Sequence, residues 1–344
     1  MKALIEKSKA NFILDEIEKP AIAIDQIIVK VSYCGICGSD LPRYFEGAVH
    51  QFPQILGHEF SGIVDQVGAH TNGINPGDRV AVAPLVPCGK CENCKKGFPA
   101  LCTQYSFVGS REDGAMAEYV SVPSQNILKL PHKVSLKEAA LIEPLTVAIH
   151  GVDRVDVHAG ARVLIFGAGT IGLMTLLTLK AKGAGPILVV DINQNKLDLS
   201  LKLGADEIIN PMKSNLREYF KENERPEYIY ETAGSAVTQV QAIDTVKKKG
   251  KVVFIGTAKK NVSYPPETFE KILRGELEVT GSWMSYSSPF PGYEWNAGLH
   301  YIEEGKIDVK PLISGIYHLE DKEKPFIDMV EKNTDRIKLL YKIE

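Results

Sequence analysis

The sequence has few of the features that mark secreted, membrane-spanning or nucleic-acid-binding proteins. Its six cysteines are too few for a disulfide scaffold in 344 residues, and their clustering in two short regions suggests metal chemistry in a reducing compartment. The longest uncharged run, Val163–Leu179, is at the short limit for a membrane span, and glycines interrupt its first half. The formal net charge of −3 gives no general attraction to nucleic acid or to anionic membranes. We therefore expect neither a nucleic acid nor a membrane partner.

The first residues, MKALIEKSKANFILDEIEKP, contain no continuous apolar segment followed by a small-residue cleavage site. No secretory signal is visible, so we expect a cytoplasmic protein. Hydrophobic residues make up 44% of the chain and charged residues 24%, which is an ordinary globular composition. A chain of 344 residues exceeds the range in which a single core keeps growing, which predicts two domains.

Two different rhythms follow one another along the chain. Short β-type runs such as QIIVKVSY and AEYVSV, separated by turn residues, predict a mainly antiparallel β domain. From about residue 160, apolar strands alternate with helical segments, as in RVLIFG, TIGLMTLLTLKAKG and PILVVD, which predicts a six-stranded, doubly wound parallel sheet. The expected fold class is α/β, with a β domain over residues 1–155, a parallel-sheet domain over 156–285, and a segment over 286–344 that returns to the first domain.

The stretch PCGKCENCKKGFPALC contains four cysteines, Cys88, Cys91, Cys94 and Cys102. Four thiolates in one short loop can surround a tetrahedral ion with no open coordination position, which is the pattern of a structural zinc site. An iron–sulfur cluster uses the same ligands and is the rival interpretation. A nucleic-acid-binding zinc finger is disfavoured, because it needs a recognition helix between its ligand pairs and a basic surface.

Three separate segments, CGSD, ILGHEFSG and ALIEPLTVAIH, offer a different set of ligands: Cys37, His58 with Glu59, and Glu143. A thiolate, an imidazole and a carboxylate make a mixed site with a position left for water or substrate, and such a site implies catalysis. Each residue also has an ordinary structural explanation, as a buried cysteine, a hydrogen-bonded core histidine or a carboxylate at a helix start. Spacing alone does not join the three segments.

The stretch RVLIFGAGTIGLM places a G-x-G-x-x-G motif directly after an apolar strand and at the start of a helix. Its glycines permit a tight turn, the close approach of a pyrophosphate, and close packing of the helix on the strand. The next strand ends at Asp191, whose carboxylate can accept hydrogen bonds from the adenosine ribose and would repel a 2′-phosphate. The sequence therefore predicts NAD rather than NADP, with cofactor-binding residues Gly167, Gly169, Thr170, Ile171, Gly172 and Asp191.

The combination of CGSD, GHEFSG, the four-cysteine loop and GAGTIG resembles the zinc-dependent medium-chain dehydrogenases over essentially the whole chain. The resemblance implies a GroES-like β domain and a Rossmann domain, a catalytic zinc in the cleft between them, and a second, structural zinc. It assigns Cys37, His58 and Glu143 as ligands of the catalytic zinc, while Glu59 exchanges with water or lies beside the metal. Cys34 matches a position without a ligand, so it is expected to be a buried structural thiol. A homodimer or homotetramer is also implied.

A glutamate ligand at position 143, where simple alcohol dehydrogenases typically have cysteine, suggests the polyol branch of this family. FVGSREDG and GSWMSYSSPFPGYEW look most similar to the galactitol 1-phosphate dehydrogenases, which oxidise a hexitol phosphate to tagatose 6-phosphate. Arg43 could hold a phosphate through forked hydrogen bonds, and Arg111 is a second candidate. Either arginine could equally be an ordinary surface or interface residue. Glu143 is also a candidate to contact the substrate.

The expected reaction is hydride transfer from a secondary alcohol to NAD. The zinc at Cys37 would acidify the bound hydroxyl, and Ser39 would accept a hydrogen bond from it and pass the proton outward. The family's relay histidine is replaced by Pro42, so the proton would leave through Glu59, the nicotinamide ribose or water. The alternatives are a dehydrogenase of an unphosphorylated polyol such as sorbitol or xylitol, or of threonine, and, more remotely, a nucleotide-binding relative without catalysis.

Overall fold

The computed structural model describes residues 1–332 and 334–344, which form two compact units. One unit contains Met1–Glu143, Tyr286–Gly305 and Val309–Glu344, and the other contains Pro144–Ser285 with Lys306–Asp308. The boundary after residue 143 falls inside helix α4 (Ile142–Val152). Within the described residues, no helix combines the length and the hydrophobicity needed to cross a bilayer.

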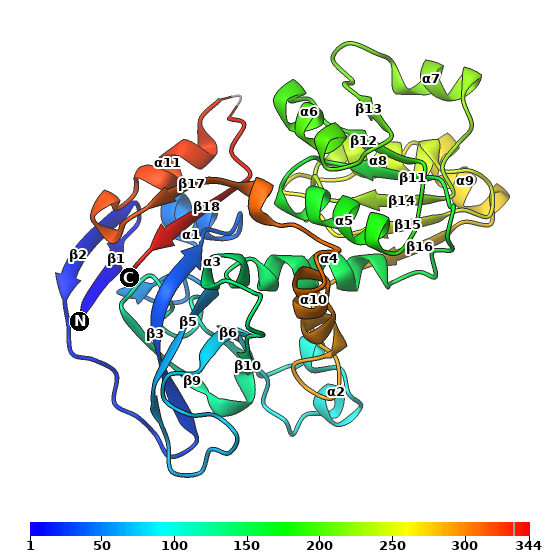
Figure 1. Cartoon of the computed structure of the whole chain (residues 1–344). Helices are drawn as coiled ribbons and strands as arrows, with labels where there is room; N and C mark the ends of the chain where they lie inside the picture. The colour runs from blue at the N-terminus through cyan, green and yellow to red at the C-terminus, as the bar shows by residue number, and fades with distance from the viewer. Residues whose placement is uncertain (333) are drawn as a thin grey trace. The chain divides into compact units, whose positions relative to one another are not determined.

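The first unit is a mainly antiparallel β structure, as its short β-type runs predicted (Figure 1). Its larger sheet has the order β10-β6-β5-β3-β18-β17, with β9 also paired to β3, and a smaller sheet has the order β2-β1-β4. β3 reads QIIVKVSYCG and is buried along most of its length, which suits its β-branched residues and its central position. The strands are β1 (Lys2–Ser8), β2 (Asn11–Glu16), β3 (Gln26–Gly35), β4 (Gln54–Ile55), β5 (Glu59–Val67), β6 (Arg79–Val82), β7 (Leu85–Val86), β8 (Ser106–Phe107), β9 (Tyr119–Pro123), β10 (Ile127–Lys129), β17 (Ile313–Tyr317) and β18 (Lys338–Lys342).

Short helices connect these strands. They are α1 (Asp40–Glu46), α2 (Glu92–Lys95), α3 (Leu136–Ala139), α10 (Tyr293–Glu303) and α11 (Lys324–Val330). Against the smaller sheet, the rings of Phe12 and Tyr44 stack with their centroids 4.5 Å apart, and Phe326 of α11 meets Phe12 edge-on. This aromatic contact joins the start of the chain, α1 and the C-terminal region in one core.

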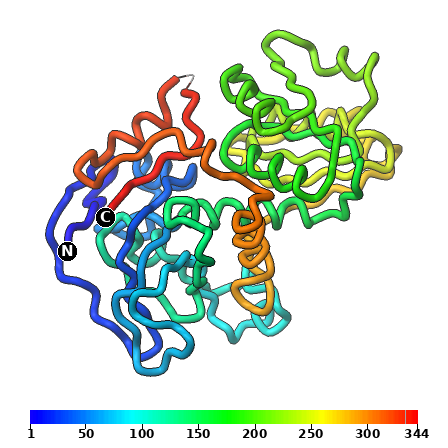
Figure 2. Tube along the Cα trace, in the orientation of Figure 1, coloured from blue at the N-terminus to red at the C-terminus, as the bar shows by residue number. Residues whose placement is uncertain are grey.

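The C-terminal strand β18 lies beside β3, which comes from the beginning of the chain (Figure 2). The pairing is antiparallel and sets Leu340 opposite Gly35 and Tyr341 opposite Cys34. β17 is parallel to β18 on its other edge. The last described strand is therefore an interior strand of the larger sheet, with a buried run from Lys338 to Tyr341.

The second unit is the predicted six-stranded parallel sheet. Its order is β13-β12-β11-β14-β15-β16, so the direction of winding reverses between β11 and β14, as in a Rossmann sheet. The helices between successive strands pack on both faces of the sheet (Figure 1). The elements are β11 (Val163–Phe166), α5 (Thr170–Ala181), β12 (Ile187–Val190), α6 (Gln194–Lys202), β13 (Glu207–Ile209), α7 (Leu216–Glu222), β14 (Tyr228–Glu231), α8 (Ala236–Thr245), β15 (Lys251–Phe254), α9 (Pro266–Arg274) and β16 (Glu278–Gly281).

Glu6 is a buried carboxyl in β1. It is 0% exposed, and neither of its oxygens has a hydrogen-bond partner among the described residues. Its cross-strand neighbour Gln54 is also buried and has an unpartnered Oε1. Burial, together with the negative charge of Asp40, raises the pKa of Glu6 to about 7. A carboxyl that keeps its proton could donate to a neighbouring oxygen, whereas an ionised one would leave a buried charge without a partner.

We expect Glu6 to make the folded protein less stable as the pH rises from about 4.5 to 7. The folded-state pKa of Glu6 lies above the ordinary value of 4.5. Its contribution to the free energy of unfolding is therefore fully present below pH 4.5 and is lost as the pH passes through 7. The loss should reach at most about 3 kcal/mol. Urea unfolding of the wild type and of Glu6→Gln at pH 5 and pH 8 measures it, because glutamine keeps a donor and does not titrate. Parallel pH profiles for the two proteins would contradict this expectation.

Candidate functional site

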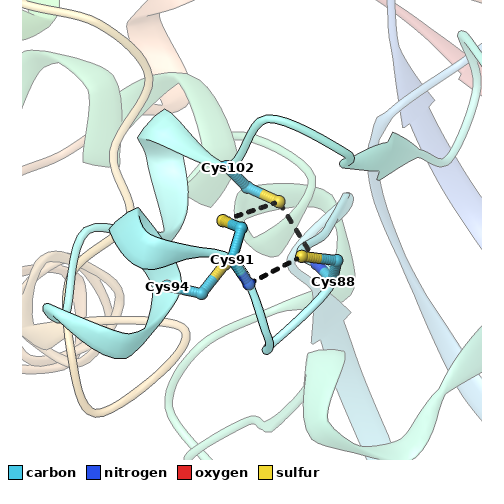
Figure 3. Close-up of side chains that lie close together, drawn as sticks. All are labelled: Cys88, Cys91, Cys94 and Cys102. Atoms are coloured by element: carbon cyan, nitrogen blue, oxygen red, sulfur yellow. Dashed lines mark hydrogen bonds between the residues drawn. The ribbon is translucent and has the colours of Figure 1, made fainter.

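The sulfur atoms of Cys88, Cys91, Cys94 and Cys102 come together in the loop between β7 and β8 (Figure 3). All four lie within 4.8 Å of one another. Backbone N–H groups point at them, as from Cys91 to the Cys88 sulfur at 3.4 Å and from Cys88 to the Cys102 sulfur at 3.3 Å. Hydrogen bonding to the backbone of Cys94 and Thr103 lowers the pKa of Cys91 to about 6. Four convergent sulfurs with N–H donors around them fit a closed tetrahedral zinc site.

A second group of convergent ligand atoms is formed by Cys37, His58 and Glu59, which also lie within 4.8 Å of one another. Cys37 follows β3, and His58 and Glu59 stand at the beginning of β5. The β3–β5 ladder pairs Gly35 with Glu59, so the end of one strand meets the beginning of the other. Cys34 is fully buried within β3 and does not belong to the group. One thiolate, one imidazole and one carboxylate fit a zinc ion that keeps an open position.

Glu143, the carboxylate ligand that the resemblance implied, is not a member of this group. It lies in the first turn of α4 and is largely buried. Burial raises the pKa of its carboxyl to about 7, which the His58 imidazole opposes and the Glu59 carboxylate reinforces. The structure thus puts Glu143 in electrostatic range of the ligand group, whereas Glu59 lies within the group.

Asp40, the last residue of CGSD, is a buried acid for which no role was predicted from the sequence. Its Oδ2 accepts a hydrogen bond from the Cys37 backbone N–H at 3.0 Å, and its Oδ1 lies 3.4 Å from His58 Nδ1. Burial alone would lower the pKa of His58, but Asp40 and Cys37 raise it well above its usual value. Asp40 therefore fixes the loop that carries one ligand and faces the imidazole of another.

Lys338 is a second charged residue for which no role was predicted from the sequence. Its side chain is 2% exposed, and its Nζ donates to Glu59 Oε2 at 2.6 Å and to the Ile36 carbonyl at 3.0 Å. Burial disfavours its ammonium form, but Glu59 and Cys37 raise its pKa above the ordinary value. A lone lysine at the start of the apolar run KLLY carries no local signal of such a partner, because the partner is 279 residues away in the sequence.

The two candidate phosphate-binding arginines have different surroundings. Arg43 donates from Nη1 to Asp40 Oδ1 at 2.8 Å and to Ser39 Oγ at 2.9 Å, and from Nη2 to Ser110 Oγ at 3.1 Å. Its side chain is 17% exposed. Arg111 is exposed and lies over the ring of Tyr105, 4.4 Å from the centroid. The Arg43 guanidinium therefore already has a carboxylate partner.

The glycine motif adopts the backbone that a dinucleotide-binding turn requires. Gly167 follows β11 with φ of 99°, a conformation that favours glycine. A Cβ on Gly172 would lie 1.9 Å from the Gly167 carbonyl oxygen, whereas a Cβ on Gly169 would meet nothing within 4 Å. Gly169 caps the N-terminus of α5, whose first residues are Thr170 and Ile171. The space over Gly169 and the helix N-terminus suit a pyrophosphate.

Asp191 follows β12 and is tied to the same turn. Its Oδ2 accepts from the Ala168 N–H at 2.7 Å, and its Oδ1 accepts from the Asn193 N–H at 2.8 Å. Each carboxylate oxygen can accept a second hydrogen bond, so Asp191 has one acceptor position for each of two ribose hydroxyls. The two N–H bonds hold the carboxylate at the carboxyl end of the sheet, where the sequence predicted it.

Two family models match the chain. The model of the alcohol dehydrogenase GroES-like domain matches residues 23–132, and the model of zinc-binding dehydrogenases matches residues 170–298. The first range covers Cys37, His58 and Glu59 together with the four-cysteine loop. The second begins within the glycine motif and includes Asp191.

Similar curated proteins and solved structures extend over most of the chain. Galactitol 1-phosphate 5-dehydrogenase of Escherichia coli (strain K12) is 40% identical over 84% of this chain and 85% of its own length. Sorbitol dehydrogenase of Bacillus subtilis (strain 168) is 34% identical over 94% of this chain and 92% of its own length. The crystal structure of galactitol-1-phosphate dehydrogenase from Escherichia coli superposes with a TM-score of 0.94 at 36% identity, covering 99% of this chain and 100% of that one.

Proposed function

Because the chain belongs to the zinc-type medium-chain alcohol dehydrogenase family, and is a zinc-dependent polyol dehydrogenase, we propose that it oxidises a secondary alcohol of a hexitol phosphate with NAD. The proposed reaction converts galactitol 1-phosphate to tagatose 6-phosphate. The observation that carries the proposal is the convergence of Cys37, His58 and Glu59 beside the buried Asp40 and Lys338. The choice of substrate follows from the 40% identity to galactitol 1-phosphate 5-dehydrogenase.

In this proposal, Cys37, His58 and Glu59 hold the catalytic zinc, and Glu143 stands near them. A zinc ion in such a site supplies a Lewis acid that favours loss of the proton from an alcohol hydroxyl. Ser39 is exposed and follows Cys37 by two residues. Its hydroxyl can therefore accept a hydrogen bond from the substrate hydroxyl and pass the proton toward solvent. Arg43 donates to Ser39 Oγ and thereby fixes the orientation of this hydroxyl.

The proposed cofactor is NAD, held at the turn formed by Gly167, Gly169, Thr170, Ile171 and Gly172. The pyrophosphate would accept hydrogen bonds from backbone N–H groups at the N-terminus of α5. The negatively charged Asp191, fixed by two backbone N–H groups, would accept from the ribose hydroxyls and repel the additional phosphate of NADP.

An unphosphorylated polyol is the second candidate substrate, and the surroundings of Arg43 favour it. A guanidinium that already pairs with Asp40 at 2.8 Å offers less charge to a phosphate than an unpaired one would. The 34% identical sorbitol dehydrogenase supports the same alternative. Arg111 is the more accessible of the two arginines, although the phenol ring of Tyr105 covers one face of it.

The test is reduction of NAD and NADP by galactitol 1-phosphate, galactitol, sorbitol, xylitol and threonine, with and without a chelator. The proposal expects NAD-linked, chelator-sensitive turnover with kcat/KM highest for galactitol 1-phosphate. If Arg43 binds phosphate, Arg43→Ala should reduce turnover of the phosphate ester more than turnover of the free polyol, with Arg111→Ala as the matched comparison. An equal reduction for both substrates would assign Arg43 to the support of Ser39 and Asp40 instead. Absence of turnover with all five compounds would contradict the proposed function.

A further inference from the structure

The ion pair between Lys338 and Glu59 is among the most buried in the described residues, with side chains 2% and 1% exposed. A buried ammonium is unfavourable unless it is paired and hydrogen-bonded, and Lys338 uses two donors, to Glu59 Oε2 and to the Ile36 carbonyl. The ladder between β18 and β3 continues to this point, since Ile36 N–H donates to the Leu339 carbonyl at 3.0 Å. One residue further along this ladder, Lys338 lies across from the beginning of the Cys37 loop.

The opposite side of the same carboxylate is equally constrained. A Cβ on Gly35 would lie 2.4 Å from Glu59 Oε2, so the oxygen that Lys338 holds occupies the space that a side chain at position 35 would need. Oε2 is therefore fixed between the backbone of β3 and the Lys338 ammonium. Because Lys338 already holds Oε2, we take the second oxygen, Oε1, as the one that would bind a metal held with Cys37 and His58.

We propose that Lys338 is a positioning residue that restricts Glu59 to single-oxygen coordination and so keeps one position on the metal open for the substrate hydroxyl. The inference rests on the proposed function, because it requires a zinc ion at Cys37, His58 and Glu59. A carboxylate free to turn can bind a metal through both oxygens, and the second oxygen would then occupy the place of water or alcohol. Lys338 prevents this by holding Oε2, and its positive charge also offsets part of the negative charge that the thiolate and carboxylates bring together.

The first test measures zinc release to a chromogenic chelator from the zinc-loaded full chain. Lys338→Met should release the zinc of this site at least about fivefold more slowly than the wild type, because the metal gains an oxygen and loses a neighbouring positive charge. The KM for the alcohol should rise at the same time. Lys338→Arg keeps a charged donor and should approach wild-type release, and Lys342→Met, an exposed lysine of the same strand, should not differ from the wild type.

The outcomes separate the inference from the proposed function. A purely structural role for Lys338 predicts faster release, because a disturbed site holds metal less well, so faster or unchanged release in Lys338→Met overturns the inference. The phase of zinc release that belongs to this site is identified with Cys37→Ser, in which this phase should be absent. If wild type and Cys37→Ser release zinc identically, the proposed metal site itself is wrong.

If Lys338→Met does not fold, a second measurement tests the same inference. In a crystal structure of the zinc-loaded wild type, Glu59 should bind the ion through one oxygen while Oε2 remains on Lys338. Coordination through both oxygens, or a Lys338 ammonium turned away from Glu59, overturns the inference.

Discussion

Replacing His58 by alanine is expected to lower kcat/KM for the preferred polyol by about 10³-fold or more. His58 supplies the only imidazole among the three convergent ligands, and Asp40 holds the surrounding loop in place. Loss of one ligand removes the ion whose Lewis acidity is worth several kcal/mol to the reaction. Steady-state kinetics and metal analysis measure the two consequences together, since the zinc content should fall from two ions per chain to one.

The matched control is His50→Ala, which removes an exposed histidine eight positions earlier in the chain. It should leave both the zinc content and the turnover at wild-type values. A His58→Ala protein that retains two zinc ions and full activity would show that the Cys37, His58 and Glu59 group is not the catalytic metal site. If His58→Ala loses zinc but keeps its activity, the site binds metal without using it in the reaction.

Replacing Cys91 by serine is expected to remove the zinc of the four-cysteine loop and to lower the unfolding temperature by at least about 5 °C. The loop consists mainly of the short helix α2 and irregular backbone, so the ion supplies much of what holds it together. Without the ion, the cysteine sulfurs no longer bind a common metal and the loop loses this cross-link. Metal analysis, calorimetry and the rate of proteolysis within residues 88–102 measure the effect.

The control for this variant is Cys34→Ala. Cys34 is as close in sequence to Cys37 as Cys91 is to Cys94, but its side chain is buried in the core of the first unit and lies outside both ligand groups. The Cys34→Ala protein should therefore keep two zinc ions per chain, although the loss of a buried sulfur should lower its stability. A Cys91→Ser protein with unchanged zinc content and unfolding temperature would exclude a structural zinc in this loop.

The parts of the fold that were predictable from the sequence are those with local signals. The six parallel strands appear as apolar runs separated by helical segments, and the glycine motif stands between one such strand and the following helix. The four cysteines of the loop are close in sequence, so their convergence was also foreseeable. In the glycine motif and in the four-cysteine loop, the residues that meet are also close together in the sequence.

The composition of the second ligand group depends on long-range pairing, which spacing does not reveal. The resemblance favoured Glu143 over Glu59 as a ligand, whereas the β3–β5 register carries Glu59 into the group with Cys37 and His58. One partner of Arg43 was equally hidden, since Ser110 is 67 residues away from it. Lys338 was the least accessible to sequence reasoning, because only the pairing of β18 with β3 makes it a neighbour of the metal site.

The interior position of β18 determines the order in which the two units can fold during synthesis. On the ribosome, the parallel-sheet unit has most of its sequence, Pro144–Ser285, in one continuous stretch and can complete its strands as soon as that stretch emerges. β3 is synthesised early, but its neighbour β18 follows only about 300 residues later. Lys338, which holds Glu59, belongs to β18 and is therefore also synthesised late. Nascent chains stalled before residue 338 should therefore contain a complete parallel sheet, whereas the larger sheet of the first unit still lacks β18 and leaves the edge of β3 unpaired.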